Sequence, residues 1–139
     1  MKLVVILATV APLIIGGGTA IGDQRLPCKG SPNIMGECFT VHGRVGAYNG
    51  IPMRMWVVGT HRMLNVVEAT ELNDDENSAI PASVGTLMAL GRPQEIVVFG
   101  DYEVCPLEKD QPGRMRAVCI ESASNLVAAK WNGTVVRPR

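Results

Sequence analysis

The sequence predicts a mainly β fold with one short helix, and three observations support this prediction. Segments of alternating apolar and polar residues recur from residue 38 onward, as in strands with one buried face. Short turn signals rich in Gly, Asn and Pro separate these segments. A single segment, residues 79–90, instead spaces its apolar residues as a helix does. The expected order is three strands, one helix and two strands.

The first strand is expected at residues 38–48. Its polar residues Thr40, His42, Arg44 and Tyr48 alternate with apolar positions that would face the core. Asn49-Gly50 then tolerates positive φ and is a strong hairpin signal. Residues 53–58 should therefore return beside the first strand.

A second turn at Gly59-Thr60 leads to a third strand expected at residues 61–71. In the helix predicted at 79–90, Pro81 suits a first helical position, while Gly91 and Pro93 should end the helix. Two further strands are expected at residues 95–107 and at 114–127 or beyond. The tail after Ala129 contains Trp131 and a second Asn-Gly, and no element is assigned to it.

This order of elements, the glycine at Gly43 in the first strand and the Asn49-Gly50 hairpin resemble the OB-fold. That fold is a five-stranded barrel with a helix between its third and fourth strands. The resemblance covers about residues 38–127. It implies a barrel face that binds oligosaccharides, oligonucleotides or proteins. A β-sandwich or an open antiparallel sheet with one helix is the alternative fold.

Residues 1–22 have the pattern of a signal peptide. Lys2 is followed by an apolar run from Leu3 to Ile15 and then by small residues. An irregular lead segment at 23–37 and a single β-rich domain at 38–139 should follow. The expected location is periplasmic or secreted. The alternative is a membrane anchor, because residues 3–22 lack charges over a length that could just cross a bilayer.

Four cysteines follow the leader, which favours two disulfides in an oxidising compartment. The short loops favour pairing Cys28 with Cys38 and Cys105 with Cys119, the latter across a hairpin. A zinc site is not expected, because the cysteines and histidines lack the close paired spacing of zinc ligands. No cofactor is expected either.

The chain has 13 basic and 13 acidic side chains, so no positive field favours nucleic acid as a partner. A binding surface is instead expected on the polar face of the first two strands and on the turn after them. Arginine and aromatic side chains grip carboxylates and stack on rings. The candidate ligand-binding residues are His42, Arg44, Tyr48, Arg54, Trp56, His61 and Arg62.

The function expected from these features is that of an exported, non-enzymatic binding module for a glycan, a peptide or an envelope protein. A structural or assembly protein of the envelope is one alternative. A small hydrolase is another, in which His42 or His61 would act with Asp101 or Glu103, and Ser122 or Ser124 would be the nucleophile. Neither serine stands in a Gly-x-Ser-x-Gly motif, so this alternative lacks a nucleophile signature.

Overall fold

The computed structural model describes residues 27–48, 51–67 and 79–138. The expected signal peptide at 1–22 and the first residues of the lead segment lie outside these ranges. Within them, no helix has both the length and the apolar character needed to cross a bilayer.

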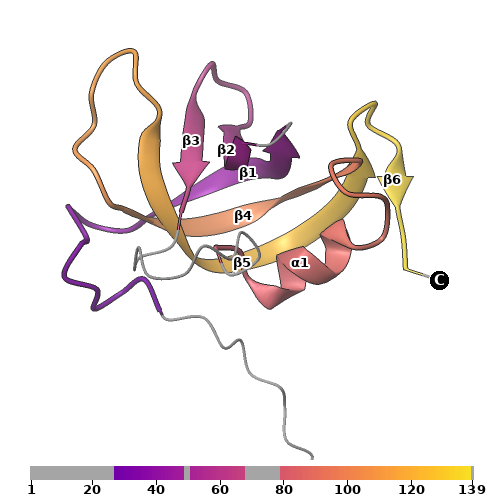
Figure 1. The fold of residues 1–139 in the computed structure, drawn as a ribbon, viewed down its shortest axis with the longest axis horizontal. Coiled ribbons are helices and arrows are strands. Elements are labelled where there is room, and N and C mark those ends of the chain that lie inside the picture. The colour runs from indigo at the N-terminus through magenta and orange to yellow at the C-terminus, as the bar shows by residue number, and fades with distance from the viewer. Residues whose placement is uncertain (1–26, 49–50, 68–78, 139) are drawn as a thin grey trace, which may run out of the picture.

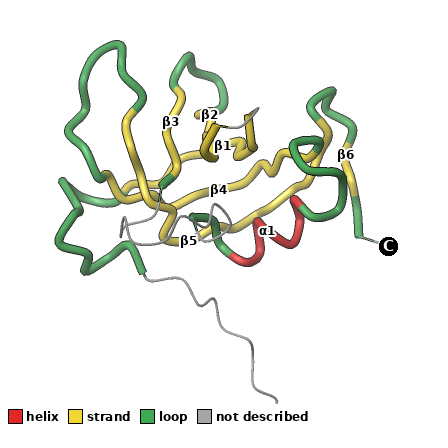
Figure 2. Tube along the Cα trace, viewed as in Figure 1, coloured by secondary structure: helices red, strands yellow, loops and turns green. Residues whose placement is uncertain are grey.

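The fold is mainly β with one short helix, as predicted (Figures 1 and 2). The elements, in chain order, are β1 (Phe39–Tyr48), β2 (Ile51–Val57), β3 (Met63–Val66), α1 (Ala82–Met88), β4 (Ile96–Pro106), β5 (Arg116–Lys130) and β6 (Val135–Val136). The expected order of three strands, one helix and two strands is confirmed. The short strand β6 was not predicted.

The hydrogen bonding of β1 to β5 closes into a ring. Antiparallel ladders join β3 to β2, β2 to β1, β1 to β4 and β4 to β5, and a parallel pairing of β3 with the start of β5 completes the circuit. Because β5 is 15 residues long, its first part borders β3 while its last part borders β6. An open sheet, the alternative expected from sequence, would lack the pairing of β3 with β5.

The core fills the inside of this ring. Its largest fully buried side chains include Val45 of β1, Met55 of β2, Leu64 of β3 and Tyr102 of β4. Gly43 allows β1 to approach them closely, since a Cβ there would lie 2.8 Å from the Met55 side chain. The glycine expected in the first strand therefore has a packing role.

The helix α1 covers one side of the sheet and packs on β4 and β5 (Figure 1). It is shorter than the predicted 79–90. Ala79 and Ile80 are buried but lie in a turn before Pro81, whose carbonyl accepts from the backbone N–H groups of Val84 and Gly85. Their burial explains why the apolar spacing extended beyond the helix itself.

The strand β3 is also shorter than the predicted 61–71. It begins at Met63 because the Val57 N–H donates to the Arg62 carbonyl and so closes the turn before it. Residues 68–71 lie outside the described residues.

All four cysteines form disulfides, but the expected pairs are wrong. Cys28 is bonded to Cys119, and Cys38 to Cys105. Cys105 and Cys119 do face each other across β4 and β5. However, β1 lies on the other side of β4, and Cys38, which immediately precedes β1, reaches Cys105 from there.

The position of the lead segment explains the disulfide between Cys28 and Cys119. The Met35 N–H donates to the Pro106 carbonyl at 2.8 Å, and the Lys29 N–H donates to a Glu121 carboxylate oxygen at 3.0 Å. These contacts lay the segment across the ends of β4 and β5. Cys28 thereby reaches Cys119, and two disulfides are typical of a protein that folds in an oxidising environment.

Candidate functional site

The outer face of β1 carries the polar residues predicted for it. In the ladders on either side, Arg44 of β1 lies opposite Trp56 of β2 and opposite Phe99 of β4. Residues directly opposite in a sheet share a face and touch. Arg44 therefore lies in the middle of a row of aromatic rings.

A second tryptophan completes the environment of Arg44. The guanidinium carbon lies 4.8 Å from the Trp56 ring centroid and 4.9 Å from that of Trp131. Both distances are within the range of cation-π attraction, which is about 6 Å. The Arg44 guanidinium thus contacts two indoles.

Trp131 reaches Arg44 from the turn between β5 and β6. Its Nε1–H donates to the Gln94 carbonyl at 2.7 Å, which fixes the ring over the sheet. The strand beneath provides space at Gly46, where a Cβ would lie 3.1 Å from Trp131 and 2.9 Å from Val97. A side chain at Gly46 would therefore displace the indole.

Tyr48 and Arg54 extend this surface toward the β1-β2 turn. Tyr48 meets Trp131 edge to face, with ring centroids 5.0 Å apart. The Arg54 guanidinium lies 5.7 Å from the Tyr48 centroid. We call the set Arg44, Tyr48, Arg54, Trp56 and Trp131 the aromatic-arginine face.

The two arginines of this face differ from other arginines of the protein. Among the described residues, neither Arg44 nor Arg54 has a carboxylate partner or a hydrogen bond to its guanidinium. The Nε of each is buried and unpartnered. By contrast, Arg62 forms an ion pair with Asp110 at 2.7 Å, and Arg116 Nε donates to the Glu108 carbonyl at 2.8 Å.

His42 lies on the same face of β1, one alternation before Arg44. Its Nδ1 is 2.9 Å from Asp101, and Asn125 donates to the other Asp101 oxygen at 2.7 Å. These two partners, Asn125 first, lower the pKa of Asp101. Asn125 has a φ of 53°, so an unusual backbone conformation within β5 presents its amide to Asp101.

Part of the hydrolase constellation considered from sequence is therefore present, since His42 and Asp101 pair. In the described part of the chain, no serine hydroxyl hydrogen bonds to His42. Ser122 instead donates to Glu103 at 3.4 Å, and Glu103 also pairs with Lys29 at 2.6 Å. The histidine and carboxylate are together without a nucleophile in contact.

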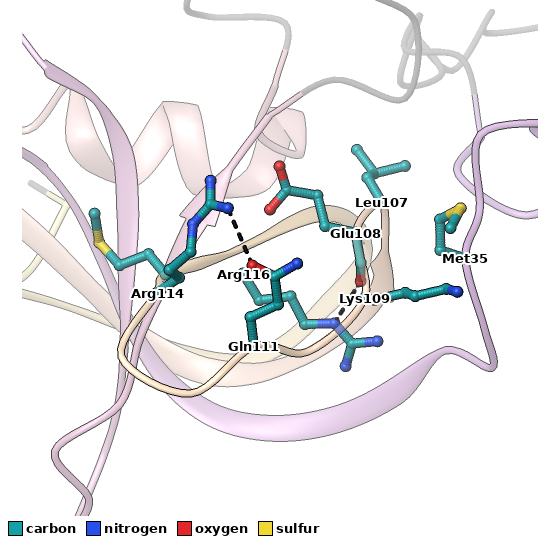
Figure 3. Close-up of a pocket in the computed structure, with 8 residues that line it drawn as sticks. Met35, Leu107, Glu108, Lys109, Gln111, Arg114 and Arg116 are labelled. Carbon is teal, nitrogen blue, oxygen red and sulfur yellow. Dashed lines mark hydrogen bonds between the residues drawn. The ribbon is translucent and has the colours of Figure 1, made fainter.

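His61 and Arg62 lie apart from the aromatic-arginine face. Both follow β2 and line a pocket with the β4-β5 loop, where Asp110 pairs with Arg62. A neighbouring pocket of about 300 Å³ lies between this loop and the lead segment. Figure 3 shows that Arg114 and Arg116 there are tied to Gln111 and to the Glu108 carbonyl.

One group of potential metal ligands occurs among the residues that the structure describes, namely Cys28, Cys105 and Glu121. Both cysteine sulfurs are in disulfides. A thiolate is the form of cysteine that binds metals, so this group does not offer thiolate ligands.

The structure thus joins four of the predicted binding residues, Arg44, Tyr48, Arg54 and Trp56, into one surface. His42 lies beside it, while His61 and Arg62 belong to another pocket. Sequence reasoning missed Trp131. The signal that could have placed it is Asn132-Gly133 directly after it, which forms the turn that pairs β6 with β5.

No protein-family model, curated protein or solved structure was found to match this chain.

Proposed function

We propose that this protein is an exported binding module of OB-like fold that takes its ligand on the aromatic-arginine face. The ligand would be a glycan, a peptide or an envelope protein. The leader pattern and two disulfides support a periplasmic or secreted location. The pairing of β3 with β5 and of β1 with β4 supports the OB-like assignment.

The observation that carries the proposal is the state of Arg44. Two indoles hold its guanidinium, and no carboxylate of the described residues neutralises it. An arginine kept for stability alone would normally gain from a carboxylate or carbonyl partner, as Arg62 and Arg116 do. Arg44 is instead fixed in position with its hydrogen-bonding capacity unused, which suits a ligand contact.

The aromatic side chains add the second part of a binding surface. Trp131 is 39% exposed, and Tyr48 and Trp56 are half-buried. Rigid aromatic rings supply contact area at a low cost in conformational entropy. A ligand with a flat apolar face could pack on the rings while it accepts hydrogen bonds from the arginines.

Tryptophan fluorescence tests this proposal directly, since Trp56 and Trp131 are the two tryptophans of the chain. A panel of oligosaccharides and peptides is titrated into the disulfide-bonded protein. A true ligand should change the emission saturably, and Trp131→Phe should reduce the change. Saturable binding by calorimetry with unchanged emission would place the ligand on another surface.

A structural or assembly role is the second proposal, favoured by Val127 and Val135, which are 44% and 54% exposed near Trp131. Exposed apolar residues beside a binding face also suit contact with a second copy. A sizing column run over a wide range of concentrations distinguishes the two roles. Assembly that Val127→Ser abolishes would favour the structural role over the binding module.

A further inference from the structure

We infer that the ligand of the aromatic-arginine face is an acidic glycan whose sugar carboxylate binds Arg44. This inference rests on the proposed function, because it names the ligand of the same surface. Three features of the face support it: the terminal nitrogens of Arg44, the second arginine at Arg54, and the pairing of β1 with a strand on each side.

The open atoms are the two terminal nitrogens of Arg44. Two indoles pack against the guanidinium, and its Nε is buried without a partner. A ligand must therefore approach the end of the guanidinium, where Nη1 and Nη2 present parallel N–H groups. A planar carboxylate matches this geometry with two charge-assisted hydrogen bonds.

The second arginine strengthens the preference for an anion. Arg54 lies opposite Gly46, one alternation along the sheet from Arg44, and contacts Tyr48 rather than a carboxylate. Asp101, the carboxylate beside His42, already accepts from Asn125 and pairs with His42. Among the described residues, the two arginines of the face therefore keep their positive charges without a carboxylate partner.

The backbone at the site argues against a peptide that binds by adding a strand. At the site, β1 has β2 on one side and β4 on the other, so Arg44 lies on a paired strand and not on a free edge. A peptide that adds a strand needs an unpaired edge. A sugar ring instead needs what this face offers, which is exposed aromatic surface beside a hydrogen-bonding group.

The test uses trigalacturonic acid as the probe, followed by tryptophan emission and by calorimetry at low and high salt. Its methyl ester has the same rings without the charge and is the matched ligand control. The acid should bind at least about tenfold more tightly than the ester. Its affinity should fall as salt rises, because the ion pair is exposed to solvent.

Three variants locate the interaction. Arg44→Gln should lower the affinity for the acid to that of the ester. Arg44→Lys should lower it by a smaller factor, because lysine keeps the charge but loses the two parallel hydrogen bonds. Arg116→Gln is the matched control, since Arg116 lies over Phe39 but donates to the Glu108 carbonyl. It should leave the affinity unchanged. Far-ultraviolet circular dichroism of each variant without ligand checks that the fold is kept.

The outcomes separate the two proposals. Equal affinity for acid and ester, or an Arg44→Gln variant that binds the acid normally, overturns the inference of an acidic glycan. If trigalacturonic acid does not bind while a peptide with a free carboxyl terminus binds through Trp131, the inference fails and the binding module stands. If saturable binding to any probe is unaffected by both Arg44 and Trp131 variants, the proposed function fails as well.

Discussion

Gly46 decides whether the aromatic-arginine face can exist. Its missing side chain leaves room for Trp131, which in turn holds Arg44 against Trp56. Three residues far apart in the sequence therefore depend on one position. The sequence alone marks Gly46 only as a small residue in a strand, so its role could not be read before Trp131 was placed.

Gly46→Ala should displace the Trp131 indole and shift the tryptophan emission to longer wavelength. The cost in stability should be about 1 to 3 kcal/mol, because the new Cβ would contact Val97 and Trp131 at overpacked distances. Gly85→Ala in α1 is the control, since its Cβ would meet only Ile80 at 3.8 Å. Unchanged emission in the Gly46 variant would show that Trp131 does not pack there.

Among the fully buried side chains that the structure describes, that of Tyr102 carries a hydroxyl that needs a hydrogen-bond partner. Its hydroxyl donates to the Val98 carbonyl at 2.9 Å, and burial raises its pKa well above the usual range. Because the folded-state pKa lies above that of the unfolded chain, the proton stabilises the fold below the ordinary tyrosine pKa of about 10. This stabilisation is lost as the pH rises further.

Tyr102→Phe should therefore cost about 1 kcal/mol at neutral pH, the value of a typical hydrogen bond. It should also remove part of the loss of stability that the native protein is expected to show between about pH 9 and about pH 11. Urea unfolding at neutral pH measures the cost of the lost hydrogen bond, and urea unfolding at the two alkaline pH values measures the change in the alkaline loss of stability. A variant with the same alkaline loss as the native protein would contradict the burial of this proton.

At the scale of elements, the ring depends on the short strand β3. Leu64, Asn65 and Val66 pair with β5, and the Val67 N–H donates to the Val118 carbonyl at 2.9 Å. This short pairing joins the two ends of the antiparallel sheet. Leu64 and Val66 also point into the core, where both are fully buried. The strand thus contributes to closure through its backbone and to the core through alternate side chains.

Leu64→Ala should destabilise the protein by about 2 to 5 kcal/mol, the usual cost of a buried leucine truncated to alanine. Met63→Ala, one residue earlier and on the other face, is only half-buried and should cost clearly less. Urea or thermal unfolding of the two variants provides the comparison. Equal losses would mean that the faces of β3 are not as the structure has them.

Strand and helix positions followed from the sequence where local pattern decides them. The alternation in β1, the return of β2 beside it and the order of elements were predicted, because period-two burial and turn chemistry are local. The Asn49-Gly50 turn itself lies outside the described residues. The ends of α1 and β3 were misjudged, since Ala79, Ile80 and Arg62 take their conformations from core burial and turn hydrogen bonds. The strand β6 is too short for a periodic signal.

For the whole molecule, the disulfides join segments 91 and 67 residues apart. Such long loops constrain the unfolded chain more than short loops do: the chain-entropy estimate gives about 4.5 kcal/mol for each of them and about 3 kcal/mol for a loop of about 15 residues. The expected pairing rested on Cys105 and Cys119 lying in consecutive strands and on the short loops. It did not include the pairing of β1 with β4, which places Cys38 next to Cys105.

A tryptic digest without reduction should yield two cross-linked products, one joining Cys28 to Cys119 and the other joining Cys38 to Cys105. Cleavage after Lys29, Arg44 and Lys109 separates all four cysteines, so the masses are unambiguous. Each pair replaced by alanines should lower the stability by up to about 4.5 kcal/mol. A product that joins Cys105 to Cys119 would contradict the described pairing.

The part of the candidate site that depends on local sequence pattern could be predicted, and the part that depends on long-range neighbours could not. Arg44, Tyr48, Arg54 and Trp56 lie on one hairpin, so the alternation of β1 and β2 was enough to gather them. Trp131 comes from the far end of the chain and depends on the β1-β4-β5-β6 order of the sheet. His61 and Arg62 were included by their nearness in sequence, but the turn after β2 directs them to Asp110 and the β4-β5 loop.

The most direct test of the binding face is an NMR titration of the isotope-labelled protein with trigalacturonic acid. Side-chain signals of Arg44 Nε, Arg54 Nε and the Trp56 and Trp131 indoles should shift together and saturate, while Arg116 Nε stays in place. Shifts confined to Arg62, Arg114 and the β4-β5 loop would contradict the account, because they would locate binding at the pockets that this loop lines.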